Sequence, residues 1–121
     1  MRILIVDDED DIRRIAKLAL GRVGAMDVVE AASGRDAVRR AEQDAPDAIL
    51  LDVMMPGLDG PSTLAALRSN PKTAGIPVVF LTAKAMPAEI ERLRGLGARG
   101  VLLKPFDPMT LASQVRAALG P

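Results

Sequence analysis

Short runs of apolar residues recur along the chain and predict buried β-strands. Each run is rich in branched side chains and is bounded by charged residues, Pro or Gly, a pattern typical of strands covered on both faces of a parallel sheet. In a weaker run Asp27 and Glu30 interrupt the apolar residues, which predicts a strand at the edge of the sheet. The expected strands cover residues 3–6, 48–51, 78–81 and 101–103, with the edge strand at 27–31.

The segment before Gly24 has apolar residues at the spacing of one helix face, and this pattern predicts that the face is buried. Gly24 is expected to end the helix, because glycine favours helix termini. The predicted buried face consists of Ile12, Ile15, Ala16, Ala19 and Val23.

Capping signals predict two helices in the middle of the chain. Ser33 and Asp36 resemble a capping box with the shorter acid, in front of a second helix. Gly60 and Pro61 are expected to start a third helix, which Pro71 closes. Their expected buried residues are Ala37, Val38, Ala41, Leu64 and Leu67.

Two more helices are expected toward the C-terminus. The fourth starts at about Pro87, and the fifth has Asp107 as its N-cap and Pro108 in its first turn. Their expected buried residues are Ile90, Leu93, Leu111, Val115 and Leu119.

Strands and helices therefore alternate five times, which predicts an α/β fold with a doubly wound parallel sheet and helices on both faces. In such sheets ligands bind at the carboxyl ends of the strands. Five polar side chains are expected to meet at that edge: Asp7, Asp8, Asp52, Thr82 and Lys104.

Composition narrows the chemistry open to this edge. The 121 residues suit one domain, and the absence of Cys and His excludes thiolate catalysis, zinc–thiolate sites and a Ser/His/Asp triad. Sixteen basic and 16 acidic residues give a net charge of zero, so no broad attraction to nucleic acid or to a membrane is expected. No apolar run is long enough for a signal peptide or a membrane span, which predicts a cytoplasmic protein.

Three neighbouring carboxylates would repel one another unless positive charge lies among them. Lys104 supplies one charge, and carboxylate and carbonyl oxygens are the ligands that Mg²⁺ prefers. A carboxylate beside a metal ion, a lysine and a threonine makes phosphoryl transfer plausible, with an aspartyl-phosphate as product. Asp52 is the natural nucleophile, because the central strand places it between the acid pair and the Thr82 and Lys104 side chains.

Four segments together resemble the receiver domain of two-component response regulators, of the chemotaxis-regulator type. They are residues 3–8 (ILIVDD), 50–60 (LLDVMMPGLDG), 81–83 (LTA) and 104–106 (KPF), and their order and spacing match the family over nearly the whole chain. The resemblance implies a flavodoxin-like fold with five strands in the order 2-1-3-4-5 and five helices. It also implies a phosphorylation-dependent signalling switch rather than an enzyme acting on a separate substrate.

The resemblance assigns roles residue by residue. Asp52 would accept the phosphoryl group from a sensor histidine kinase or a histidine phosphotransfer protein. Mg²⁺ would be held by Asp8, Asp52 and the backbone carbonyl of Met54, with Asp7 acting largely through water. Lys104 would pair with the phosphoryl oxygens ahead of a cis peptide to Pro105, Thr82 would move to bond one of them, and Ala83 would keep the approach open.

Some positions depart from the family pattern. Val101 stands where many members have an aromatic switch residue, and valine is too short and stiff for that movement. The resemblance places Met54 and Lys84 at the positions that border the phosphoryl site, and the methionine is expected to screen this site from water, so that the chain dephosphorylates slowly. Phosphorylation is nevertheless expected to alter the surface of the fourth helix, fifth strand and fifth helix, which would engage a downstream protein.

Residues 97–101 lack the paired acids of the subfamily that dimerises through the fourth and fifth helices, so a monomer or weak dimer is expected. Arg92, Arg94 and Arg99 form either a docking surface or a solvated face. Residues 1–121 are expected to be one receiver domain without an output domain, and the sequence leaves open whether it stands alone or begins a longer regulator.

Two alternative functions remain open at this point. A phosphatase with an aspartyl nucleophile would use Asp7 and Glu9, two residues apart, but it would leave Asp52 without a role. An adaptor that keeps the fold without phosphorylation has no reason to retain all five polar residues. A flavin-binding module is excluded, because the first loop is acidic and the chain has no Trp or Tyr.

Overall fold

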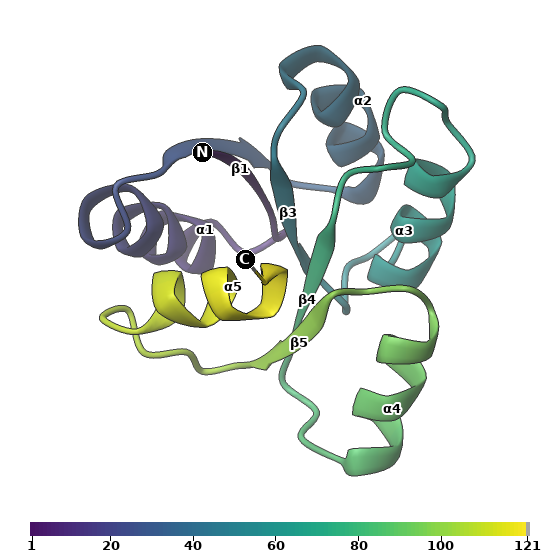
Figure 1. Ribbon diagram of the computed structural model, residues 1–121. Coiled ribbons are helices and arrows are strands. Elements are labelled where there is room, and N and C mark those ends of the chain that lie inside the picture. The colour runs from purple at the N-terminus through teal and green to yellow at the C-terminus, as the bar shows by residue number, and fades with distance from the viewer. Residues whose placement is uncertain (121) are drawn as a thin grey trace.

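Five parallel strands lie side by side in the order β2-β1-β3-β4-β5, which confirms the predicted fold (Figure 1). The computed structural model describes residues 1–120; the last residue of the predicted domain, Pro121, lies outside this range. The strands are β1 (Arg2–Val6), β2 (Asp27–Ala31), β3 (Ala48–Asp52), β4 (Val78–Thr82) and β5 (Gly100–Leu103).

Helices follow each strand and cover both faces of the sheet (Figure 1). Within residues 1–120 no helix has the length and apolar character needed to cross a bilayer. The helical elements are α1 (Asp10–Leu18), the π-helical segment η1 (Ala19–Val23), α2 (Gly34–Asp44), α3 (Gly60–Arg68), α4 (Pro87–Gly95) and α5 (Leu111–Leu119).

The sheet separates two hydrophobic cores. On one face α2, α3 and α4 pack against side chains such as Leu51 and Phe80, and on the other α1, η1 and α5 pack against Leu50 and Leu81. Successive residues of a strand point to opposite faces, so β3 and β4 contribute to both cores. All five residues of β3 and all five of β4 are buried, so these two strands form the centre of the sheet in both cores.

The first helix differs from its prediction. Ala16 and Ala19 are buried, but Ile15 and Val23 are 41% and 48% exposed. Val23 lies in the π-helical segment η1, whose wider turn rotates it away from the face that α1 buries. Leu20, which the predicted face omitted, is fully buried in its place. The helix ends at Gly24 as expected.

The fifth helix starts later than predicted. Asp107 does not cap α5, because residues 108–110 form a turn and the helix begins at Leu111. Asp107 instead organises this turn: its side-chain oxygen accepts from the backbone N–H of Met109 at 2.9 Å, and its carbonyl accepts from Thr110 and Leu111. The buried Leu111 and Val115 are confirmed.

The starts of α2 and α3 follow the capping signals. The Ser33 hydroxyl accepts from the backbone N–H of Asp36 at 3.1 Å, as the capping box predicts. Asp59, which the sequence reading omitted, caps α3 by accepting from Ser62 N–H at 2.8 Å. Gly60 is required by close approach, since a Cβ there would lie 2.6 Å from the carbonyl oxygen of Asp52.

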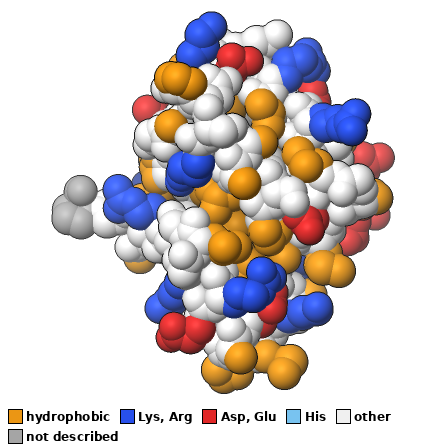
Figure 2. All heavy atoms as spheres, turned by 90° about the vertical axis from the view of Figure 1, so that its right-hand side faces the viewer, with side chains coloured by type: hydrophobic (Ala, Val, Ile, Leu, Met, Phe, Trp, Pro, Cys, Tyr) orange, Lys and Arg blue, Asp and Glu red, His pale blue; other side chains and the backbone are white. Residues whose placement is uncertain are grey.

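The α4 helix is weakly anchored. Leu93 is its one buried residue, and the N-cap residue Met86 makes no side-chain capping bond. Figure 2 views the face on the α3 and α4 side, where apolar side chains gather in the middle with charged side chains around them. Met86 is 66% exposed and Leu96, just beyond the helix, is 43% exposed.

Candidate functional site

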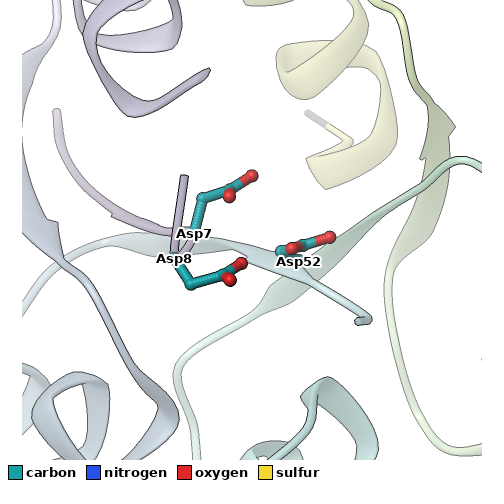
Figure 3. A group of neighbouring side chains, drawn as sticks. All are labelled: Asp7, Asp8 and Asp52. Atoms are coloured by element: carbon teal, nitrogen blue, oxygen red, sulfur yellow. The ribbon is translucent and has the colours of Figure 1, made fainter. Parts of the chain in front are cut away.

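The carboxyl ends of β1 and β3 bring three carboxylates together, as the sequence predicts. Asp7 and Asp8 follow β1, and Asp52 is the last residue of β3. Figure 3 shows the three side chains beside one another, and each offers an oxygen atom within 4.8 Å of the others. Asp7 and Asp52 are buried, whereas Asp8 is exposed.

Both carboxylate oxygens of Asp7 are engaged within the protein. One accepts from the backbone N–H of Glu9 at 2.9 Å, and the other accepts from the ammonium group of Lys104 at 2.8 Å. Asp7 is 1% exposed. These bonds leave its oxygens less free to bind a ligand directly than those of Asp8.

Lys104 supplies the positive charge that the acid cluster requires. It follows β5, and its ammonium nitrogen lies 3.2 Å from an oxygen of Asp52 as well as bonding Asp7. Burial lowers the pKa of Lys104, but the hydrogen bond to Asp7 and the attraction of Asp52 outweigh this effect and raise it. Lys104 is therefore charged at neutral pH. Its peptide bond to Pro105 is cis, as the resemblance implies.

Asp52 is held in an unfavourable environment for a negative charge. Burial, and then the neighbouring charge of Asp7, raise its pKa from 3.8 to about 6, although Lys104 acts in the opposite direction. A single lysine therefore does not balance these carboxylates. At pH 7 Asp52 is mostly ionised, as a nucleophilic carboxylate must be.

The donor set fits a hard divalent cation. Three carboxylates converge, and the chain has no Cys or His that would favour zinc or copper. The unbalanced charge at Asp52 is a second sign that a cation belongs among these oxygens. Lys104 contacts both Asp7 and Asp52, and the backbone N–H of Glu9 also bonds Asp7, whereas Asp8 is the exposed carboxylate of the three.

Thr82 ends β4, next to β3, as predicted. The side chain is 1% exposed, and its hydroxyl oxygen accepts from the backbone N–H of Lys84 at 3.1 Å. Among the described residues no hydrogen bond joins this hydroxyl to Asp52. Ala83 and Lys84 are both exposed beside it.

The remaining predicted site residues lie around this centre. Met54 follows β3 and its side chain is 62% exposed. Val101 is half-buried on β5 and packs against the core on the α2, α3 and α4 face. Of the three arginines proposed for docking, Arg92 pairs with Glu89 at 2.7 Å and Arg99 donates to the carbonyl of Leu119 at 3.1 Å.

Arg13 is a site neighbour that the sequence reading missed. Its guanidinium donates to the backbone carbonyl of Asp7 at 2.8 Å, and its side chain is 15% exposed. The adjacent Arg14 has a side chain that is 74% exposed. One sequence offers no signal that separates two adjacent arginines on a charged helix.

Comparisons with known proteins place the chain among signalling domains. The family model of the response regulator receiver domain matches residues 3–116. The chain is 39% identical over 120 residues to a probable transcriptional regulator, ycf27, of Guillardia theta. It is also 39% identical over 120 residues to the alkaline phosphatase synthesis transcriptional regulatory protein PhoP of Bacillus subtilis. Each alignment covers 98% of this chain but 45% and 48% of those proteins, so the chain spans about half their length.

Solved structures agree in fold over the full chain. The chemotaxis protein CheY4 of Vibrio cholerae superposes with a TM-score of 0.88 at 32% identity, covering 97% of both chains. A response regulator from Desulfuromonas acetoxidans gives a TM-score of 0.86 at 27% identity, covering 98% of this chain and 95% of its own.

Proposed function

Because the chain belongs to the response regulator receiver domain family of two-component systems, we propose that it is a signalling switch that is phosphorylated on Asp52. The observation that carries this proposal is the position of Asp52 at the end of the central strand, buried and within 3.2 Å of Lys104. Asp8 is the exposed member of the same cluster, so a donor group can approach from the side on which Asp8 lies.

In the proposed reaction a carboxylate oxygen of Asp52 forms a bond to phosphorus while the bond from phosphorus to a histidine nitrogen of the donor breaks. The donor is a sensor histidine kinase or a histidine phosphotransfer protein, since this chain has no histidine. Lys104 pairs with the phosphoryl oxygens and offsets the added negative charge. Mg²⁺, when bound, supplies further positive charge to those oxygens.

The residues that would hold Mg²⁺ are Asp8, Asp52 and the backbone carbonyl of Met54, with Asp7 acting through water. The engagement of both Asp7 oxygens by Glu9 and Lys104 supports this division of roles. A phosphatase that uses Asp7 and Glu9 would leave Asp52 without a role.

The proposed switch runs through Thr82. Its hydroxyl accepts a bond from Lys84 N–H in this structure, and a phosphoryl group on Asp52 offers the same hydroxyl a stronger acceptor to which it can donate. Movement of Thr82 draws in the loop at Ala83 and Lys84, which leads to the weakly anchored α4. The altered surface of α4, β5 and α5 then engages a downstream protein.

Partner contacts of this chain are proposed to be with proteins. The net charge of zero gives no broad electrostatic attraction to nucleic acid or anionic membrane. Two relatives are named transcriptional regulators, and those names describe proteins of about twice this length. The cytoplasmic location and the monomeric or weakly dimeric state remain predictions.

Intact mass spectrometry tests the phosphorylation site. The chain is incubated with Mg²⁺ and acetyl phosphate, and we expect one added phosphoryl group that is absent from Asp52→Asn. Asp11→Asn, which changes an exposed acid on α1, is the matched control and should be labelled like the unaltered chain. A chain that takes no label, or a label that persists in Asp52→Asn, would contradict the proposal.

A further inference from the structure

Arg13 contacts the backbone of the acid cluster from α1. One terminal nitrogen of its guanidinium donates to the carbonyl oxygen of Asp7 at 2.8 Å. Asp7 lies one residue beyond β1, so this carbonyl is outside the hydrogen-bond ladder of the sheet, whose last paired residue on β1 is Val6. Arg13 therefore supplies the hydrogen bond to this carbonyl at the point where the pairing of β1 ends.

The guanidinium is itself held in place by two acids. Its Nε lies 3.4 Å from a carboxylate oxygen of Glu30 on β2, and its other terminal nitrogen pairs with Asp10. Glu30 also pairs with Lys17 at 3.3 Å, and on the sheet it stands opposite Ile5 of β1. Arg13 thus joins α1, the end of β1 and the edge strand β2 in one set of contacts.

The bond to the Asp7 carbonyl has a geometric consequence for both acids. The peptide unit is planar, so the carbonyl of Asp7 and the N–H of Asp8 turn together. A hydrogen bond that fixes the direction of that carbonyl therefore fixes the orientation of the Asp7–Asp8 peptide plane. The orientation of this plane in turn constrains where the side chains of Asp7 and Asp8 point.

The effect of Arg13 is geometric more than electrostatic. Asp10 and Glu30 already pair with its charge, so little of it remains to act on the acid cluster. A lysine at this position would keep the charge. It would lack the planar guanidinium group, whose nitrogens contact the Asp7 carbonyl and Glu30 at the same time.

We propose that Arg13 is a positioning residue that sets the Asp7–Asp8 peptide and thereby prepares the carboxylates of Asp7 and Asp8 for a divalent cation. This inference rests on the proposed function, because it assigns Arg13 a part in the metal site of that function. Residues that orient metal ligands commonly change metal affinity by 10-fold or more when they are replaced.

Calorimetric titration with Mg²⁺ alone, well below the unfolding temperature, tests this role. We expect Arg13→Gln to weaken Mg²⁺ binding by about 10-fold. Arg13→Lys should bind Mg²⁺ more tightly than Arg13→Gln but less tightly than the unaltered chain, since lysine keeps the charge but lacks the guanidinium group. Arg14→Gln is the matched control and should bind like the unaltered chain, because Arg14 is exposed and its ion pair with Asp11 measures 3.9 Å.

A second measurement separates positioning from general destabilisation. With acetyl phosphate as donor, the phosphorylation rate of Arg13→Gln should be low at limiting Mg²⁺ and recover at saturating Mg²⁺. Glu30→Gln, which leaves Arg13 intact but removes one of its anchors, should weaken Mg²⁺ binding in the same direction by a smaller factor. This variant keeps the test available if Arg13→Gln does not fold.

The outcomes distinguish the two proposals. If the unaltered chain binds Mg²⁺ and is phosphorylated while Arg13→Gln, or Glu30→Gln in its place, binds Mg²⁺ as tightly as Arg14→Gln, the positioning role is wrong and the proposed function stands. If the unaltered chain neither binds Mg²⁺ nor takes a phosphoryl group, the proposed function fails and the role of Arg13 fails with it.

Discussion

The ammonium nitrogen of Lys104 lies 2.8 Å from a carboxylate oxygen of Asp7, and this contact joins the end of β5 to the end of β1 across the two strands between them. Both side chains are largely buried. The pair holds the edge of the sheet together at the place where the proposed chemistry occurs.

Replacing Lys104 with Met should destabilise the metal-free protein, because the change leaves Asp7 and Asp52 buried without their cation. Breaking a buried ion pair from one side costs about 3 kcal/mol of unfolding free energy. Urea denaturation at pH 7 measures this loss, and added Mg²⁺ should restore part of it. Lys72→Met, which changes an exposed lysine, is the control, and equal unfolding free energies for the two variants would contradict the prediction.

Asp52→Asn should alter the dependence of stability on pH. The pKa of Asp52 is raised to about 6 in the folded protein from 3.8, so the folded state binds the proton more tightly than the unfolded state. The resulting stabilisation is complete below about pH 4 and is lost as the pH rises through 6. The uncharged Asn avoids that loss, so the metal-free variant should gain up to about 3 kcal/mol on the unaltered chain between pH 4 and pH 7.

Urea denaturation of both proteins with a chelator, at several pH values from 4 to 8, measures this difference. Other titrating groups are shared by the two proteins and cancel in the comparison. Stability curves that stay parallel across the range would show that Asp52 titrates with its ordinary pKa.

Met54→Asn should shorten the lifetime of the phosphorylated protein several-fold. Met54 borders the proposed site on the loop after β3, and its apolar side chain is expected to hinder water that would attack the acyl phosphate. An amide at this position can hydrogen-bond such a water instead. The decay of the phosphorylated mass with time measures the lifetime, and a variant that decays no faster than the unaltered chain would refute the screening role.

Gly60→Ala should disturb Asp52 through its backbone. A Cβ at Gly60 would lie 2.6 Å from the carbonyl oxygen of Asp52 and 2.7 Å from Cα of Val53, so the start of α3 or the end of β3 must shift. We expect a loss of about 2 kcal/mol in unfolding free energy together with slower phosphorylation. Gly75→Ala is the matched control, since nothing lies within 4 Å of its Cβ position, and equal effects of the two changes would contradict this reading.

The sequence was sufficient for the sheet and for most of the site because both depend on strand ends. Apolar runs located the five strands, and the residue that follows or ends each run fixed Asp7, Asp8, Asp52, Thr82 and Lys104 at one edge. Parallel strands bring their carboxyl ends together regardless of helix detail, so errors in the helices did not affect this inference.

The features that the sequence did not reveal depend on local backbone geometry or on contacts between distant residues. The π-helical turn that contains the exposed Val23 has no signature in the apolar spacing, which fits a continuous α-helix equally well. The pair Asp107 and Pro108 is equally typical of the first residues of a helix and of a turn that precedes a helix, so the sequence did not show that α5 begins later. The proposed role of Arg13 depends on Glu30, which is brought to it by the pairing of β2 with β1.

The elements around the site differ in how deeply they are buried. Asp52 stands on β3, whose residues are all buried, while Leu93 is the one fully buried residue of α4. A partner that binds α4 would therefore contact the same weakly buried element that the proposed phosphoryl group must move, and its binding would favour one position of this helix over another.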